Sequence, residues 1–354
     1  MNTFKKILVV FNDETDNQAL IDQAVSLAKS NGATITAIDV VEPRTDTTPI
    51  LTENVENLDP QLAGVEFIEE LPGAENITEY VKTKIGGKPE ILIGNERFNV
   101  QEFFLQQELD HFEGFVSALR NGGVEVKGIK VNGIAFIEII REVIKNQHDL
   151  VMLSAEGGEH KADPLFGNTT MHLVRKCPCP VWAVKPGQQA PVKRILAAVD
   201  LAEEDAGRVE LAKQILELSL SAAQQGGAEL VILHAWSLFG ESVLRGRAGI
   251  PEDAVNKLLA ETQAAHRQWL RELLSQVQIG NTRIQVFLLK GNASDLIPQL
   301  TRSNEIDLLV MGTVSRGGIA GLLIGNTAEK VLPKLNCSIM TAKPAGFITP
   351  VKLD

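Results

Sequence analysis

The sequence predicts an α/β protein with two tandem, doubly wound domains, each built on a mostly parallel five-stranded sheet. Three observations carry this prediction: the length of the chain, an internal repeat, and an alternation of short apolar runs with helical patterns. The 354 residues amount to two domains of roughly 150 residues with about 50 left over. We therefore expect a duplicated domain with one added segment.

An internal repeat divides the chain. Residues 133–186 align with residues 291–344 at a constant offset of 158 without a gap. Near the front of each copy, Lys6–Leu8 matches Arg194–Leu196 at an offset of 188, so the first copy is 30 residues longer. Self-similarity at a fixed offset indicates repeated structural units.

The added segment is acidic. We expect the first domain at residues 1–187, the second at 192–346 and a tail at 347–354, with the added residues inside about 42–110. That segment holds 15 Asp+Glu and 5 Lys+Arg, which is −10 of the net charge of −11. It is expected to be either a solvated surface excursion or a lid or partner-docking surface beside the first-half cleft.

Short apolar runs and helical patterns alternate in each copy. In the second half the expected strands are Arg194–Val199, Glu229–Ala235, Thr282–Leu289, Asp307–Met311 and Ser338–Ala342. The helical patterns between them are Ala206–Ala223, Pro251–Val277, Ser294–Ser303 and Thr327–Leu335. Apolar runs without alternation are typical of strands covered on both faces, and repeated β-α units favour a parallel, doubly wound sheet.

Charge and cysteine content exclude several classes of protein. A net charge of −11 has the wrong sign for binding nucleic-acid phosphates or anionic membranes. Three cysteines fit a reducing cytoplasm, and the apolar run Ile7–Phe11 is too short for a signal peptide. Cys177 and Cys179 lack the spacing of a zinc site, so no structural metal is expected. No catalytic triad or nucleophile elbow is recognisable, so no catalytic residue is assigned.

A glycine-rich loop follows the fourth strand of the second half. It begins at Gly312 and ends at Gly325-Asn326-Thr327, where a helix starts. Backbone N–H groups at such a place can cradle an anion, and Arg316 would add a charge-assisted contact. The alternative is a flexible loop in which Asn326 or Thr327 caps the helix.

A carboxylate, Asp200, stands directly after the first strand of the same half. In open α/β sheets, ligands sit beyond the carboxyl ends of the strands. Asp200 could accept a hydrogen bond there from an exocyclic amine or a ribose hydroxyl. The alternative is that it forms a turn or caps a helix.

These residues resemble the universal stress protein family. The likeness lies in ILAAVD, in the loop GTVSRGGIAGLLIGNTAEKVL and in the end strand CSIMTAKP, while HLVRKCPCPVWAVKP and GFITPVKLD are similar to its tandem E-type branch. The resemblance implies an adenine-nucleotide α-hydrolase-like fold. It also implies that the end strands, Val181–Val184 and Ile339–Ala342, join the two halves as an internal pseudo-dimer.

The resemblance further implies a nucleotide site in the second half. Asp200 would face adenine, Ala235 would line the base pocket, and Gly312, Gly325 and the residues after Gly325 would hold the phosphates. The full set of expected binding residues is Asp200, Ala235, Met311, Gly312, Ser315, Arg316, Gly325, Asn326 and Thr327.

Two positions depart from the family pattern. Ser315 stands where the second glycine belongs, and Asn326 stands where serine or threonine is expected. If that glycine has φ > 0, serine costs about 1–2 kcal/mol, or around tenfold in affinity. We therefore expect ATP or a related adenine nucleotide to bind weakly, with Mg²⁺ entering only together with the nucleotide.

The first copy is expected to be degenerate. Ser154 replaces its leading glycine, and Asn12 replaces Asp200. Carboxylates at Glu156, Glu159 and Asp163 stand where the second copy offers Arg316, and like charges would repel a triphosphate.

Three functions stay open at this point. The first is a cytoplasmic stress-response binding and signalling protein with weak nucleotide binding in its second domain. The others are a non-nucleotide interaction scaffold and a slow ATPase. The expected partners are an adenine nucleotide and a protein at the acidic insertion, and whether two chains form a homodimer is left open.

Overall fold

The computed structural model describes residues 4–13, 15–41, 90–93, 96–155, 165–202, 205–246, 250–313 and 325–353, of which residues 90–108 and 225 are described by their backbone alone. The chain divides into two compact units. One contains Met1–Val41 and Phe112–Asp354, and the other contains Glu42–His111. They are treated separately below.

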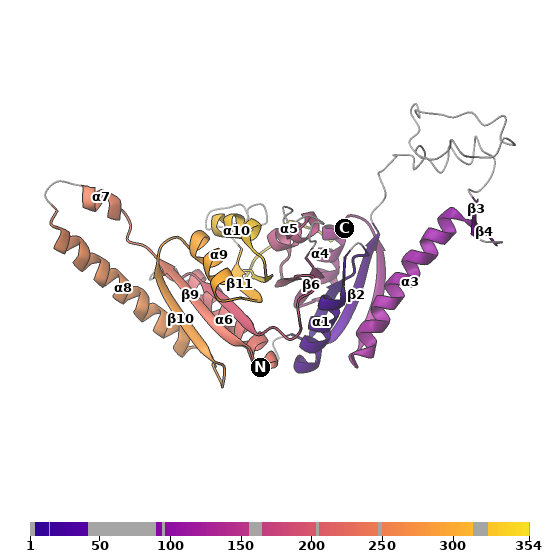
Figure 1. The fold of residues 1–354 in the computed structure, drawn as a ribbon, viewed down its shortest axis with the longest axis horizontal. Helices are drawn as coiled ribbons and strands as arrows, with labels where there is room; N and C mark the ends of the chain where they lie inside the picture. The colour runs from indigo at the N-terminus through magenta and orange to yellow at the C-terminus, as the bar shows by residue number, and fades with distance from the viewer. Residues whose placement is uncertain are drawn as a thin grey trace, which may run out of the picture. The chain divides into compact units, whose positions relative to one another are not determined.

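The larger unit is built on one ten-stranded sheet (Figure 1). The strand order is β10-β9-β8-β11-β12-β7-β6-β1-β2-β5. The strands are β1 (Lys6–Val10), β2 (Thr34–Val41), β5 (Val126–Asn132), β6 (Leu150–Ser154), β7 (Val181–Val184), β8 (Arg194–Val199), β9 (Glu229–Trp236), β10 (Ile284–Lys290), β11 (Leu308–Gly312) and β12 (Ser338–Ala342). Each half contributes five parallel strands, which confirms the predicted fold class.

The end strands of the two halves pair with each other. β7 and β12 run antiparallel, with Ile339 opposite Ala183 and Thr341 opposite Val181. This is the joint that the family resemblance implies. It makes the two half-sheets continuous through backbone hydrogen bonds.

Helices cover both faces of this sheet. They are α1 (Gln18–Asn31), α4 (Ala135–Asn146), α5 (Asn168–Lys176), α6 (Ala206–Gly226), α8 (Glu252–Ser275), α9 (Ala293–Ser303) and α10 (Asn326–Val331), while α3 (Val100–Asn121) crosses the boundary between the units. The short helix α7 (Glu241–Gly246) has no buried residue. One apolar core contains residues of α1, α6 and α8, and the other contains residues of α4, α5, α9 and α10. Two cores on opposite faces are the signature of a doubly wound sheet. No helix in the described ranges combines the length and apolar character needed to cross a bilayer.

Equivalent side chains start both halves in the same way. Asp149 accepts hydrogen bonds from the backbone N–H groups of residues 5–6, and Asp307 accepts the same pair of bonds from residues 193–194. Each aspartate precedes the fourth strand of its half and holds the first strand beside it. The repeat in the sequence therefore corresponds to a repeated contact in space.

Most predicted helices and strands of the second half differ from the structure by one to three residues at an end, as fraying of helix and strand ends would give, and two differences have a physical bearing. The third strand of the second half starts at Ile284 rather than Thr282. The predicted helix Thr327–Leu335 consists of α10 and a separate 3-10 turn, η3 (Leu332–Lys334). Pro333 lies in this turn, and because it has no backbone N–H it cannot continue the α-helical hydrogen bonding.

The smaller unit contains a hairpin. β3 (Glu90–Ile93) pairs antiparallel with β4 (Glu96–Asn99), and α3 follows. Residues 42–99 separate β2 from α3, whereas residues 237–251 separate β9 from α8. The last residues of the predicted insertion thus begin a helix whose counterpart in the second half is α8, and residues 42–89 lie outside the described part.

Candidate functional site

The predicted ligand site of the second half lies where the strand order reverses. β8, β9 and β10 succeed one another on one side, and β11 and β12 lie on the other. Asp200 directly follows β8, and Gly312 ends the neighbouring strand β11. The N–H of Gly325 donates to the carbonyl of Thr313 at 3.0 Å, which returns the loop to the same edge. Such a switch point is where open α/β sheets bind ligands.

Asp200 is exposed but has an ion-pair partner. Its side chain is 58% exposed, and its Oδ2 lies 3.6 Å from Nη1 of Arg208 on α6. Arg208 is held in turn by Asp205, whose Oδ2 accepts from Nε at 2.8 Å. Asp205 also caps α6, since its Oδ1 accepts from the Arg208 N–H. The capping role proposed as an alternative for Asp200 thus belongs to Asp205.

The start of α10 lies beside Thr313 at the same edge of the sheet. Gly325 occupies the N-cap position in an extended conformation, with φ −63 and ψ 143. Asn326 and Thr327 are therefore the first two helical residues, and neither is the N-cap residue. The first N–H groups of a helix have no intrahelical acceptor, so they can bind a ligand.

The other predicted site residues divide into three groups. Ala235 is half-buried near the end of β9. Met311 is 3% exposed and its side chain packs in a core. At Gly312 an added Cβ would come within 2.8 Å of Leu211 Cδ2, so this glycine allows α6 to pack closely. Ser315 and Arg316 lie outside the described residues.

A buried lysine connects this loop to the first half. Lys343 follows β12 and is 4% exposed. Its amine donates to the carbonyl of Val174 on α5 and to Oγ1 of Thr313, whose hydroxyl also donates to Val174 at 3.1 Å. Burial lowers the pKa of Lys343 to about 8, while nearby Cys177 acts in the opposite direction. Thr313, the residue directly after β11, is thereby fixed to α5 of the first half.

A histidine and tryptophan cluster lies next to Ala235. His234 on β9 is fully buried; its Nδ1 lies 3.2 Å from the Val199 carbonyl and its Nε2 lies 2.8 Å from Nδ1 of His266 on α8. The rings of Trp236 and Trp269 lie 5.9 Å and 4.7 Å from that of His266. Burial lowers the pKa of both histidines.

Sequence reasoning missed Arg208, Lys343 and the two histidines. Two of these had a local signal. Asp205 and Arg208 have the spacing of an ion pair at a helix start, and His234 is a polar residue inside an otherwise apolar strand.

The matching edge of the first half is built differently. The backbone carbonyl of Asn12 accepts hydrogen bonds from Asn17 Nδ2 at 2.7 Å and from Thr15 Oγ1 at 3.3 Å. The turn after β1 is therefore held by hydrogen bonds between its own residues. Ser154 Oγ donates to the Asp16 carbonyl at 3.4 Å. The predicted repulsive carboxylates Glu156, Glu159 and Asp163 lie outside the described residues.

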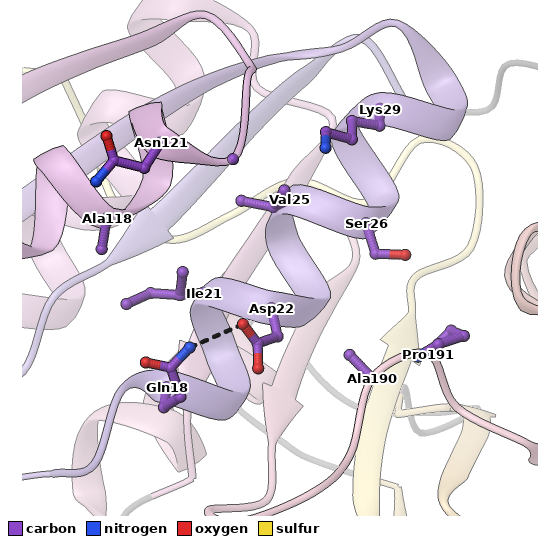
Figure 2. A pocket seen from close by; sticks show the side chains of 11 residues that line it. Gln18, Ile21, Asp22, Val25, Ser26, Lys29, Ala118, Asn121, Ala190 and Pro191 are labelled. Atoms are coloured by element: carbon purple, nitrogen blue, oxygen red, sulfur yellow. Dashed lines mark hydrogen bonds between the residues drawn. The ribbon is translucent and has the colours of Figure 1, made fainter.

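A groove of about 650 Å³ lies beside α1 in the first half (Figure 2). Its walls come from α1, the end of α3 and the linker at Ala190-Pro191. Ile21 and Val25 give it apolar surface, and Gln18 donates to Asp22 at 2.8 Å at one end. None of the predicted site residues lines it.

Comparison with known proteins gives consistent results. The sequence matches the Universal stress protein family at residues 3–185 and again at residues 191–343. "Universal stress protein E" of Escherichia coli (strain K12) is 28% identical over 291 residues, covering 78% of this chain and 90% of that protein. The protein of the same name from Salmonella typhi is 31% identical over 231 residues, covering 65% and 72%.

Solved structures with this fold span nearly the whole chain. A putative universal stress protein from Pseudomonas aeruginosa UCBPP-PA14 has a TM-score of 0.63 and 21% identity, and a functionally unknown protein from Pseudomonas aeruginosa PAO1 has a TM-score of 0.61 and 21% identity. Each match covers 97% of this chain and 94% of the other. At this identity the likeness concerns the fold.

Proposed function

Because the chain belongs to the universal stress protein family and carries two tandem family domains, we propose that it is a stress-response binding protein whose second domain binds an adenine nucleotide weakly. One observation carries the proposal. The structure brings the exposed carboxylate of Asp200 to the same switch point as the two ends of the glycine loop, Gly312 and Gly325.

The base would bind at the β8 side of the cleft. An ionised carboxylate only accepts hydrogen bonds, so Asp200 suits an exocyclic amine such as that of adenine. Arg208 at 3.6 Å orients this carboxylate without covering it. Ala235, half-buried on the neighbouring strand, has a small side chain that leaves room for a flat ring.

The phosphates would bind at the β11 side. Backbone N–H groups at the start of α10, with the side chains of Asn326 and Thr327, supply hydrogen-bond donors there. Arg316 in the loop adds positive charge, and Mg²⁺ would accompany a triphosphate. We assign this site to binding rather than turnover, since the aspartate lies on the base side of the cleft.

Calorimetry with ATP tests the proposal. We expect weak binding, in the high micromolar range, that falls about tenfold or more in Asp200→Ala, because a hydrogen bond to a charged group contributes about 1.5–3 kcal/mol. Asn12→Ala is the matched control in the first half and should leave the affinity unchanged. No heat of binding at any ATP concentration, or an equal heat of binding in Asp200→Ala, would contradict the nucleotide proposal.

The scaffold function is favoured by a different observation. Ser315 and Asn326 both weaken the family's loop pattern, and the acidic insertion concentrates negative charge that the repeated sequence itself lacks. In this second proposal a basic protein partner docks at residues 42–110 in the cytoplasm. Mass spectrometry of the purified protein distinguishes the two proposals, since co-purified nucleotide contradicts a purely scaffolding role.

The third candidate function, a slow ATPase, has a separate test. Nucleotide-dependent phosphate release that is lost in Gly325→Val would favour it over both binding roles.

A further inference from the structure

A hydrogen-bonded pair of histidines lies one strand position away from the proposed base site. His234 pairs with Val199 across β8 and β9, and Val199 immediately precedes Asp200. His234 Nδ1 lies 3.2 Å from the Val199 carbonyl oxygen, and its Nε2 lies 2.8 Å from Nδ1 of His266. Any change in the charge of this pair therefore acts directly on the end of β8.

The hydrogen bonds determine where the hydrogens are. A carbonyl oxygen only accepts, so His234 Nδ1 must donate to Val199. In the neutral pair His234 Nε2 then has a lone pair and accepts from the Nδ1–H of His266. This leaves Nε2 of His266 as the one ring nitrogen of the pair that can take up a proton without a rearrangement.

Beyond the N–H that each neutral ring already carries, the pair of histidines can take up one additional proton but not two. A proton on Nε2 of His266 leaves both hydrogen bonds intact. A second proton would have to enter on His234 Nε2, where it would meet the Nδ1–H of His266 and break the 2.8 Å contact. The geometry thus predicts a single protonation step rather than two independent ones.

The surroundings act on this proton in opposite directions. Burial, the largest effect, lowers the pKa of both histidines from 6.5, and His234 lowers the pKa of His266 further. The hydrogen bond to Val199 raises the pKa of His234, and the carboxylate of Asp200 raises both. The ring centroids of Trp236 and Trp269 lie 5.9 Å and 4.7 Å from that of His266, within the distance at which an aromatic ring can attract a cation. Arg208 on α6, the charged partner of Asp200, competes with that imidazolium for the carboxylate.

We propose that His234 and His266 form a one-proton sensor that regulates the second-half cleft. When the pH falls far enough to protonate His266, the imidazolium attracts the carboxylate of Asp200, which is then less available to a bound base. Ligand affinity in that cleft falls with pH, and by linkage ligand binding expels the proton. The sensor itself stands on the geometry of the pair, and only its effect on affinity rests on the proposed nucleotide site.

Tryptophan fluorescence between pH 8 and pH 5 tests the sensor without any nucleotide. A protonated imidazole in contact with an indole quenches its emission, so we expect one single-proton quenching step with a midpoint below 6.5. His266→Gln should abolish the step and Trp269→Phe should shrink it. His172→Gln, which removes a histidine stacked on Phe136 in the first half, is the matched control and should leave the step unchanged.

Nitrogen NMR of the imidazoles keeps the test valid even if a variant misfolds. In the unaltered protein, His266 Nε2 should titrate while His234 keeps its proton on Nδ1 throughout. Absence of any quenching step, a step that persists in His266→Gln, or titration of His234 before His266 would each overturn the inference.

The regulatory effect is measured as ATP affinity at pH 7.5 and pH 5.5. We expect about fivefold weaker binding at the lower pH in the unaltered protein. His266→Gln should show a smaller pH dependence. Comparing the two proteins corrects for the protonation of ATP itself, which is the same in both titrations. Equal pH dependence in the two proteins would overturn the regulation. If ATP binds at neither pH while the fluorescence step is present, the proposed function fails and the sensor stands.

Discussion

The two halves have the same scaffold but different strand ends. Asp149 and Asp307 hold the first strand of each half with the same two hydrogen bonds. After those strands the halves diverge: the Asn12 carbonyl is bonded within its own turn, whereas Asp200 presents an exposed carboxylate. Packing is thus repeated in both copies, while the residue that follows the first strand carries a carboxylate in the second copy and an amide in the first.

The joint between the halves gives the largest expected effect. Trp182 on β7 is 2% exposed and lies opposite Met340 on β12. Trp182→Ala should lower the free energy of unfolding by about 3–5 kcal/mol, because it removes a large buried side chain and leaves a cavity. Urea denaturation measures this, with Phe239→Ala, a 98% exposed position, as the control. A loss below about 1 kcal/mol would show that the halves do not depend on this contact.

Lys343 gives a pH-dependent difference between the copies. Its pKa is about 8 in the folded chain against an ordinary 10.5, so the unfolded chain binds more protons between these values. The free energy of unfolding should therefore rise from pH 8 to pH 10.5, by at most about 3 kcal/mol. Lys343→Met should lose this rise, and Lys185→Met, the equivalent position in the first copy, should keep it. Urea denaturation at pH 8 and at pH 10.5 measures the change in the free energy of unfolding. An equal change in Lys343→Met and Lys185→Met would contradict the assignment of this rise to Lys343.

The two aspartate clamps test whether the scaffold is truly shared. Asp149→Ala and Asp307→Ala each remove an acceptor of two backbone N–H groups at the start of a first strand. Each should destabilise the protein by about 1–2 kcal/mol, and by similar amounts, as followed by thermal unfolding. A difference of more than about 1 kcal/mol between the two variants would show that the scaffolds are not equivalent.

The smallest effect is expected for Asn12→Asp, which places the carboxylate of the second copy into the first. The change lies in a surface turn, so stability should alter by no more than about 0.5 kcal/mol. It should not create a second nucleotide site, because the sequence after Ser154 keeps the carboxylates of Glu156, Glu159 and Asp163. The number of ATP molecules bound per chain, measured by calorimetry, checks this prediction. Two ATP per chain would contradict the view that these carboxylates prevent nucleotide binding in the first copy.

The fold was largely predictable because its signals are local. β8 and β12 have the predicted bounds, since each is a short, mostly apolar run between turn residues. α7 was not predicted, because six residues carry too little periodicity. This helix is held by tertiary ion pairs, such as Lys290 Nζ with Glu241 Oε1 at 2.6 Å and Arg245 Nη1 with Glu252 Oε1 at 2.9 Å.

The candidate site was predictable only in part, for a similar reason. Asp200 and the loop ends are recognisable because each stands next to a strand that the sequence reveals. Lys343 and Val174 are 169 positions apart, and His234 and His266 are 32 apart. Contacts over such separations depend on how helices and strands dock, and no local pattern records that.

The antiparallel joint between β7 and β12 has a consequence for symmetry. Had two identical single-domain chains formed this sheet, every substitution would occur twice, once on each side of the two-fold axis. Here both partners belong to one polypeptide, so the joint forms at a fixed effective concentration and does not dissociate on dilution. One edge can then carry an asparagine where the other carries an aspartate, and a single molecule has two differently equipped sheet edges on one shared frame.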